Sequence, residues 1–182
     1  SIWLPYSAEI WLEGTRDTSK TETMLAACKA SDQSLRKMWA AIEGRLTDQK
    51  YKDVPIIIAG DFNSMSHLDY GEIGWDQYEA VVKWPTSTIL PNQGFTDSYR
   101  ACNPRIDRKA DSTWTPRFPK QQQDRIDFIY HRHARTQSVT VVPSASRVIK
   151  EHKTRFPSDH AALLSTLRIA KQQPTKARDV DL

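Results

Sequence analysis

The stretch that decides the fold reads Ile56-Ile57-Ile58-Ala59-Gly60-Asp61-Phe62-Asn63. A short, β-branched run that is apolar at every position predicts a strand over 56–59 that is buried on both faces. If the chain stays extended beyond Gly60, the side chains of Asp61 and Asn63 point the same way, whereas Phe62 points back into the core. A carboxylate and an amide at a strand end can carry chemistry, but an ordinary strand-to-turn signal has the same pattern.

Two further stretches place charged residues at the edges of expected strands. In Asp124-Arg125-Ile126-Asp127-Phe128-Ile129-Tyr130, the carboxylate of Asp127 interrupts a segment bound for the core, which is costly unless the charge has a partner. An ion pair with a nearby arginine is the structural alternative. In Ser158-Asp159-His160-Ala161-Ala162-Leu163-Leu164, the adjacent Asp159 and His160 point to opposite sides of a strand start. A histidine held by a second carboxylate is a poised acid or base, while a turn with a satisfied core histidine is the alternative.

The rest of the pattern predicts a layered α/β or α+β domain. Apolar residues that recur at three, four or seven positions predict one long amphipathic helix over 20–46. Further expected elements are, in chain order, a short strand at 2–4, helices at 75–84 and 87–90, and strands at 126–130, 138–142 and 161–169. Reactive groups would then lie at strand ends.

Length and composition narrow the class of protein. With 182 residues the chain is one ordinary domain or a large part of a bigger one, and its six Trp, six Tyr and five Phe can fill a core. A mean hydropathy of −0.63 and the lack of a long unbroken apolar run exclude a membrane-spanning helix. Cys28 and Cys102 rule out a disulfide framework and a four-cysteine zinc site. Two reduced, buried thiols are the favoured interpretation, and one disulfide is the alternative.

The charge is concentrated in one segment. The chain carries a formal net charge of +4, and between Arg100 and Arg135 nine basic residues face four acidic ones. A local positive field suits a phosphate-bearing substrate, whereas a solvated, arginine-rich loop is the alternative. Asp97 is expected to be a structural carboxylate. The remaining histidines form no metal-binding pattern and are expected at the surface or in loops: His67, His131, His133 and His152.

In this order, the Gly-Asp-Phe-Asn, Arg-Ile-Asp-Phe-Ile and Ser-Asp-His signatures that begin at Gly60, Arg125 and Ser158 resemble those of the endonuclease/exonuclease/phosphatase superfamily. The resemblance covers residues 20–169 and implies the deoxyribonuclease-I-like fold, an α+β, four-layer α/β/β/α sandwich. Intermediate features add to it: Ser66-His67-Leu68-Asp69, Trp84-Pro85-Thr86-Ser87, Gly94-Phe95-Thr96-Asp97-Ser98-Tyr99-Arg100 and Thr113-Trp114-Thr115-Pro116.

The resemblance implies a phosphoesterase that uses magnesium, with manganese as the alternative, and in which water attacks phosphorus in line. It assigns Asp61 to orienting or deprotonating the water and Asn63 to a phosphate oxygen or a metal-bound water. Asp159 is expected to bind the metal together with these two residues. His160, kept protonated by Asp127, is expected to stabilise the charge of the transition state.

Three residues are expected to contact the substrate: Arg100, Trp114 and Asp124. Asp124 is also a second candidate for the carboxylate that pairs with the histidine. Trp114 either packs over the site or belongs to the core.

The chain departs from the family pattern in its first part, because no segment before Lys20 resembles the opening Asn strand or the later metal-binding Glu of the family. We therefore expect residues 1–170 to form a partial domain whose N-terminal half is missing, followed by a frayed tail at 171–182. Three explanations stay open: a fragment of a longer enzyme, a chain that pairs with a separate first half, and a shortened relative that has lost catalysis. An open sheet edge would then favour aggregation.

The leading functional hypothesis is a hydrolase of phosphodiesters or phosphomonoesters. Nucleic acid, phospholipid head groups, inositol phosphates and small nucleotides are all substrates within the superfamily. The alternative is a non-catalytic binding module, or an inactive fragment, on the same fold. A binding module needs none of the polar site residues, and their presence argues against it. The pattern predicts no cellular compartment.

Overall fold

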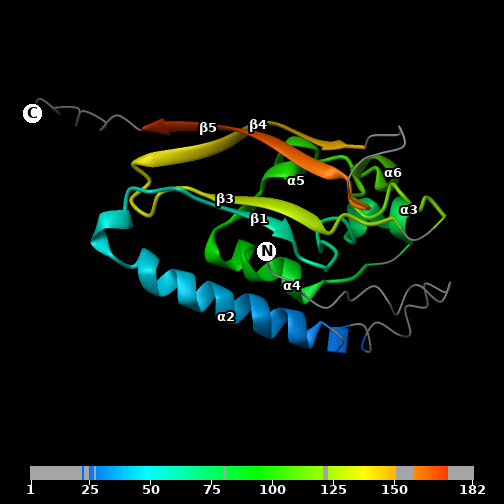
Figure 1. Ribbon diagram of the computed structural model, residues 1–182, viewed down its shortest axis with the longest axis horizontal. Coiled ribbons are helices and arrows are strands. Elements are labelled where there is room, and N and C mark those ends of the chain that lie inside the picture. The colour runs from blue at the N-terminus through cyan, green and yellow to red at the C-terminus, as the bar shows by residue number, and fades with distance from the viewer. Residues whose placement is uncertain are drawn as a thin grey trace, which may run out of the picture.

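The computed structural model describes residues 22, 25, 26, 28–79, 81–120, 123–150 and 158–171 (Figure 1). The strand expected at 2–4 and nearly all of the expected tail at 171–182 lie outside this part of the chain. Within it, α2 (Lys29–Leu46) confirms the predicted long helix from Lys29 onward.

Two antiparallel sheets form the centre of the structure. The first has the strand order β1-β3-β2, with β1 at Ile56–Asp61, β3 at Asp127–Arg132 and β2 at Thr96–Asp97. In the second sheet β4 (Val139–Ile149) pairs with β5 (Ala162–Lys171). Strands β3, β4 and β5 confirm the predictions at 126–130, 138–142 and 161–169, although β4 continues well beyond its predicted end.

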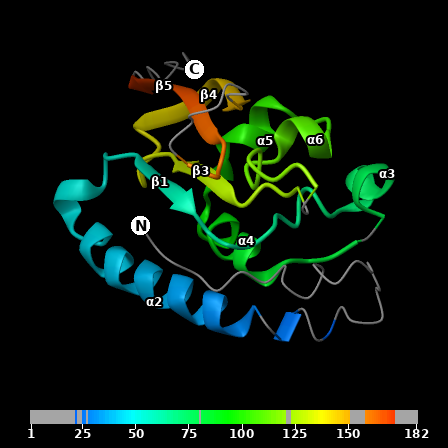
Figure 2. The ribbon, with the colours of Figure 1, turned by 45° about the vertical axis from the view of Figure 1, so that its right-hand side comes forward.

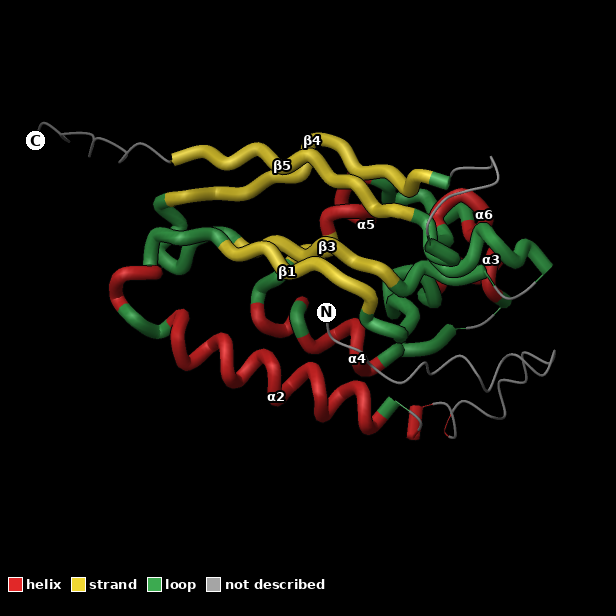
Figure 3. The backbone as a smooth tube through the Cα atoms, in the orientation of Figure 1, coloured by secondary structure: helices red, strands yellow, loops and turns green. Residues whose placement is uncertain are grey.

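The elements lie in layers (Figures 2 and 3). Helix α2 lies along one side of the first sheet, and the β4–β5 hairpin lies on the other side. Because α2 is amphipathic, its apolar stripe can be buried, and Leu35 and Trp39 join Phe62 and Phe128 in one core cluster. Helix α5 (Ser98–Cys102) packs against both β3 and β4. This arrangement confirms the α+β class.

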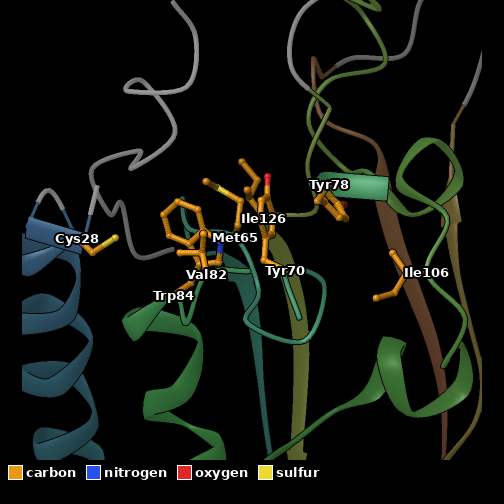
Figure 4. Packing of buried hydrophobic residues seen from close by; sticks show 8 residues of the cluster. All are labelled: Cys28, Met65, Tyr70, Tyr78, Val82, Trp84, Ile106 and Ile126. Atoms are coloured by element: carbon orange, nitrogen blue, oxygen red, sulfur yellow. The ribbon is translucent and has the colours of Figure 1, made fainter. Parts of the chain in front are cut away.

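A second apolar cluster packs beneath the loops that follow β1 (Figure 4). Its members are Cys28, Met65, Tyr70, Tyr78, Val82, Trp84, Ile106 and Ile126. Ile126 immediately precedes β3, so packing of this cluster helps to fix where the strand begins. Both cysteines are free thiols, and Cys28 is buried whereas Cys102 is partly exposed.

Several short helices connect the strands: η3 (Gln49–Tyr51), η4 (Glu72–Gly74), α3 (Trp75–Tyr78), α4 (Pro85–Ile89), η5 (Pro91–Gln93) and α6 (Arg108–Asp111). The prediction of one helix over 75–84 is wrong in extent. Glu79 has a φ of 51°, in the left-handed region, which ends α3 after a single turn. The helix predicted at 87–90 is present as α4 and begins two residues earlier, at a proline, which is favourable in a first turn.

The prediction that the strand at 56–59 is buried on both faces is wrong, because one face is exposed in the described structure. The side chain of Ile57 is 48% exposed, whereas Ile56 and Ile58 pack against the core. The physical reason is that Ile57 points to the face opposite Ile56 and Ile58, and the second sheet packs against β3 rather than over this face of β1. Among the described residues, no helix is both long and apolar enough to cross a membrane.

Candidate active site

Two carboxylates from distant parts of the sequence meet at one end of the first sheet. Asp61 ends β1, Asp127 begins β3, and the two residues are register partners (Figure 1). Burial raises the pKa of Asp61. The backbone N–H of Asn63 opposes this shift, the charge of Asp127 adds to it, and the charge of His160 opposes it. Asp61 is therefore a carboxylate with an increased affinity for a proton.

The backbone turns sharply after β1. Asn63 has a φ of 45°, which asparagine tolerates better than most residues, and Oδ1 of Asp61 accepts its N–H at 2.8 Å. The chain does not stay extended, so the condition for Asp61 and Asn63 to point the same way is not met. Phe62 is buried as predicted, and its ring packs edge-on against Phe128 and Tyr130.

His160, just before β5, contacts the first sheet from the second one. Its Nδ1 lies 2.9 Å from Oδ2 of Asp127. This hydrogen bond raises the pKa of His160, burial opposes the shift, and the charges of Asp127, Asp61 and Asp159 add to it. The histidine is half-buried beside these carboxylates, and its partner is Asp127 rather than the second candidate, Asp124.

Trp114 packs over this histidine. The ring centroids of Trp114 and His160 are 4.8 Å apart, in an edge-to-face arrangement. The indole is partly buried against the second apolar cluster, and the backbone of Trp114 forms isolated bridges to Asp124 and His160. Both alternatives for this residue hold, because it lies beside the site and also extends the core.

Hard oxygen donors lie at the same end of the molecule. Asp159 is partly exposed, Asp61 is the last residue of β1, and Asn63 lies just beyond the end of that strand. Among the described residues, no three His, Cys, Asp or Glu side chains form a complete metal cluster. Proteins generally give Mg²⁺ about one or two carboxylates, with water and substrate phosphate as the other ligands. The described residues supply oxygen donors of the kind that Mg²⁺ prefers, without forming a metal site by themselves.

Two of the expected substrate-contacting residues are buried. Arg100 is 8% exposed, and its guanidinium lies 2.8 Å from carboxylate oxygens of Asp69 and Asp111. Asp124 is fully buried, and its Oδ1 accepts a hydrogen bond from the Tyr70 hydroxyl at 2.7 Å. Because both side chains are buried and contact internal groups, neither reaches a surface where a substrate could contact it in this conformation.

A buried ionic network surrounds the entry to β3. Arg125 is fully buried and forms ion pairs with Asp69 at 2.9 Å and Asp97 at 2.7 Å. Asp69 is shared with Arg100, and Asp97 also caps the N-terminus of α5. The network joins the loop after β1, the β2–α5 junction and the start of β3. It thereby fixes the backbone two residues before Asp127, and Asp97 has the structural role predicted for it.

The basic stretch is less exposed than its sequence suggests. Arg100 and Arg125 are internal, and the guanidinium of Arg132 lies over the rings of Trp39 and Phe95. The exposed bases of the stretch are Arg105, Lys109, Arg117, Lys120 and Arg135.

The other histidines lie in different surroundings. His131 is buried in β3, with its Nδ1 2.8 Å from the hydroxyl of Ser98, so the expected surface position is wrong for this residue. Burial lowers the pKa of His131 and also that of the half-buried His67. His133 is partly exposed, and His152 lies outside the described residues.

Two threonines for which the sequence alone predicts no role contact both parts of the site. The Oγ1 of Thr113 accepts the N–H of Asp127 at 3.2 Å, and the Oγ1 of Thr115 donates to the carbonyl of Asp159 at 2.6 Å. Their only sequence signal is the Thr-Trp-Thr-Pro motif, and the partners of the hydroxyls depend on tertiary structure.

This chain belongs to the Endonuclease/Exonuclease/phosphatase family, which it matches over residues 29–160. It is similar to the uncharacterized protein F14F9.5 of Caenorhabditis elegans, with 31% identity over 131 residues, which are 64% of this chain and 42% of that protein. The crystal structure of D. rerio TDP2 complexed with single strand DNA product is 20% identical, with a TM-score of 0.46, and the match covers 78% of this chain and 52% of that one. The chain thus spans about half the length of these proteins or less, and the resemblance inferred from its motifs is confirmed.

Proposed function

We propose that this protein hydrolyses a phosphate ester, with Asp61, Asp127 and His160 as its central catalytic groups. The observation that carries the proposal is the 2.9 Å contact between Asp127 and His160, beside a carboxylate whose pKa is raised. Together these groups supply an acid and a base within one small region. Membership of the Endonuclease/Exonuclease/phosphatase family supports the same class of reaction.

In the proposed mechanism Asp61 orients the attacking water and accepts its proton. The bond from the water oxygen to phosphorus forms as the bond to the leaving oxygen breaks in line, and the leaving group departs as an alkoxide that takes its proton from solvent. His160, kept charged by Asp127, donates a hydrogen bond to a phosphoryl oxygen as negative charge develops there. Asn63 contributes its amide to the same phosphate.

Magnesium is the proposed cofactor, and manganese shares its preference for hard oxygen ligands. Asp159, Asp61 and Asn63 would hold the ion, which when bound would neutralise charge on the phosphoryl oxygens. The negative charge that Asp61, Asp127 and Asp159 place around His160 supports binding of a cation here.

The proposed substrates are phosphodiesters or phosphomonoesters, with nucleic acid as the first candidate. Exposed bases such as Arg105, Lys109 and Arg117 support a polyanion. A purely binding role is less well supported, because binding alone does not require a charged Asp127–His160 pair beside another carboxylate.

The test is hydrolysis of bis(4-nitrophenyl) phosphate and 4-nitrophenyl phosphate with MgCl₂, MnCl₂ or EDTA, by this chain and by any longer form of the protein that contains it. His160→Ala is expected to lower kcat by about 10²–10⁴-fold without unfolding the protein. Asp159→Ala is expected to abolish the response to magnesium. The matched control is His67→Ala, since His67 is bound to Ser87 and lies outside the site. Turnover that survives His160→Ala at the wild-type rate would contradict the proposal.

A further inference from the structure

We infer that Thr113 and Thr115 are positioning residues that hold Asp127 and His160 together across the two sheets. The kinetic consequence of this inference rests on the proposed function, but its structural consequence does not. Asp127 begins β3 of the first sheet, whereas His160 precedes β5 of the second. Their contact therefore depends on how the two sheets are held relative to each other at this end of the molecule.

The first anchor is on the β3 side. Thr113 is fully buried, and its Oγ1 accepts the backbone N–H of Ile126 at 3.1 Å and that of Asp127 at 3.2 Å. Its own N–H donates to the carbonyl of Asp124 at 3.0 Å. One side chain and one backbone group of Thr113 thus fix the backbone from which the Asp127 carboxylate extends.

The second anchor is on the β5 side. The carbonyl of Thr113 accepts the N–H of Ala161 at 2.7 Å, and the Oγ1 of Thr115 donates to the carbonyl of Asp159 at 2.6 Å. Ala161 and Asp159 are the two sequence neighbours of His160, so the backbone is held on both sides of the histidine. Trp114, between the two threonines, packs its ring against the imidazole.

The segment 113–115 is thus a short brace between the sheets, and it meets each sheet next to one member of the catalytic pair. Neither threonine hydroxyl is available to a substrate, because both are engaged with backbone groups and both residues are fully buried. Their effect on a reaction would be transmitted through Asp127 and His160. A misplacement of about 1 Å at a reacting group can cost 100-fold in rate.

The test compares Thr113→Val and Thr115→Val, which remove the hydroxyl and keep the shape, with Thr113→Ser and Thr115→Ser, which keep the hydroxyl. Thr88→Val is the matched control, since Thr88 donates to the carbonyl of Pro85 at 2.7 Å within α4. Crystal structures of the valine variants are expected to show Asp127 and His160 beyond hydrogen-bond distance. We expect kcat to fall by about 10–100-fold with KM unchanged, and the serine variants and the control to retain the wild-type rate.

A 2.9 Å contact between Asp127 and His160 that persists in both valine variants would overturn the inference. Equal losses of kcat in the valine and serine variants would also overturn it, because a general packing defect gives that result. If Thr113→Val does not fold, Thr115→Val carries the test, since it leaves the contacts to β3 in place. If the wild-type protein hydrolyses no phosphate ester, the proposed function fails, and the crystal structures still decide this inference.

Discussion

The guanidinium of Arg125 has no exposed surface, and its charge is matched by Asp69 and Asp97. It also lies over the ring of Phe128, 4.7 Å from the centroid, next to the strand that carries Asp127. A buried charge is tolerated only where its partners are complete, so removal of one member leaves the others uncompensated.

Replacement of this one side chain is expected to have a large effect on stability. Arg125→Met should lower the free energy of unfolding by about 3–5 kcal/mol, because Asp97 remains buried without its cation and Asp69 keeps only its ion pair with Arg100. Urea denaturation followed by circular dichroism measures the loss. The exposed Arg105 is the matched control, and Arg105→Met should stay within about 0.5 kcal/mol of wild type. Similar losses in the two variants would contradict a structural role for the network.

Asp127 has the largest effect on the charge state of His160. The pKa of His160 lies above the ordinary value of 6.5, chiefly because of the hydrogen bond to Asp127, so Asp127→Asn is expected to lower it. The titration of the imidazole ring protons by NMR measures both values. A raised folded-state pKa contributes stability below the unfolded pKa, and this contribution is lost as the pH rises through the folded pKa. An unchanged midpoint in Asp127→Asn would mean that Asp61 and Asp159 suffice to keep the ring charged.

Among single residues, those at strand ends could be predicted from the sequence. Asp61, Asp127 and His160 interrupt apolar runs, and a buried charge in such a position needs a partner. The burial of Arg100 could not be predicted from the sequence, because it depends on Asp69, which is 31 residues away in the chain. No local pattern distinguishes an arginine with internal partners from one that faces a substrate.

At the scale of elements, strands with β-branched and apolar runs were predictable, and α3 was not. The residues after Tyr78 continue a helical pattern, but Glu79 adopts a left-handed backbone conformation that ends the helix. The left-handed turn occurs at a glutamate rather than a glycine, so no local signal in the sequence marks the end of the helix.

The end of α3 offers a test of that account. Glu79→Gly is expected to stabilise the protein by several tenths to about 1 kcal/mol, because glycine adopts the left-handed conformation without strain. The same substitution near the C-terminal end of α2, Glu43→Gly, should destabilise by up to about 1 kcal/mol. Thermal unfolding of both variants measures the two effects. Destabilisation by Glu79→Gly would show that its side chain matters more than its backbone.

At the scale of the whole molecule, apolar side chains remain exposed on both sheets. They are Ile57 on β1, Val142 on β4, and Leu164 and Ile169 on β5, each between 47% and 56% exposed. Exposed apolar residues on strands favour association with other chains.

Self-association of this chain should therefore depend on β5. Leu164→Lys combined with Ile169→Lys is expected to reduce concentration-dependent association, because it removes two exposed apolar side chains from the strand. Sedimentation velocity over a range of concentrations measures the change. Thr166→Lys adds a charge at an exposed polar position of the same strand and is the control. Equal effects in both variants would assign the change to net charge alone.

The packing of Trp114 on His160 also makes the site observable by light. An imidazolium quenches the fluorescence of an indole that it touches far more strongly than a neutral imidazole does, and here the two ring centroids are 4.8 Å apart. The chain contains six tryptophans, so the difference in emission between wild type and Trp114→Phe isolates this one fluorophore. Its intensity would report, without added label or substrate, how the proton occupancy of the histidine changes as a ligand arrives.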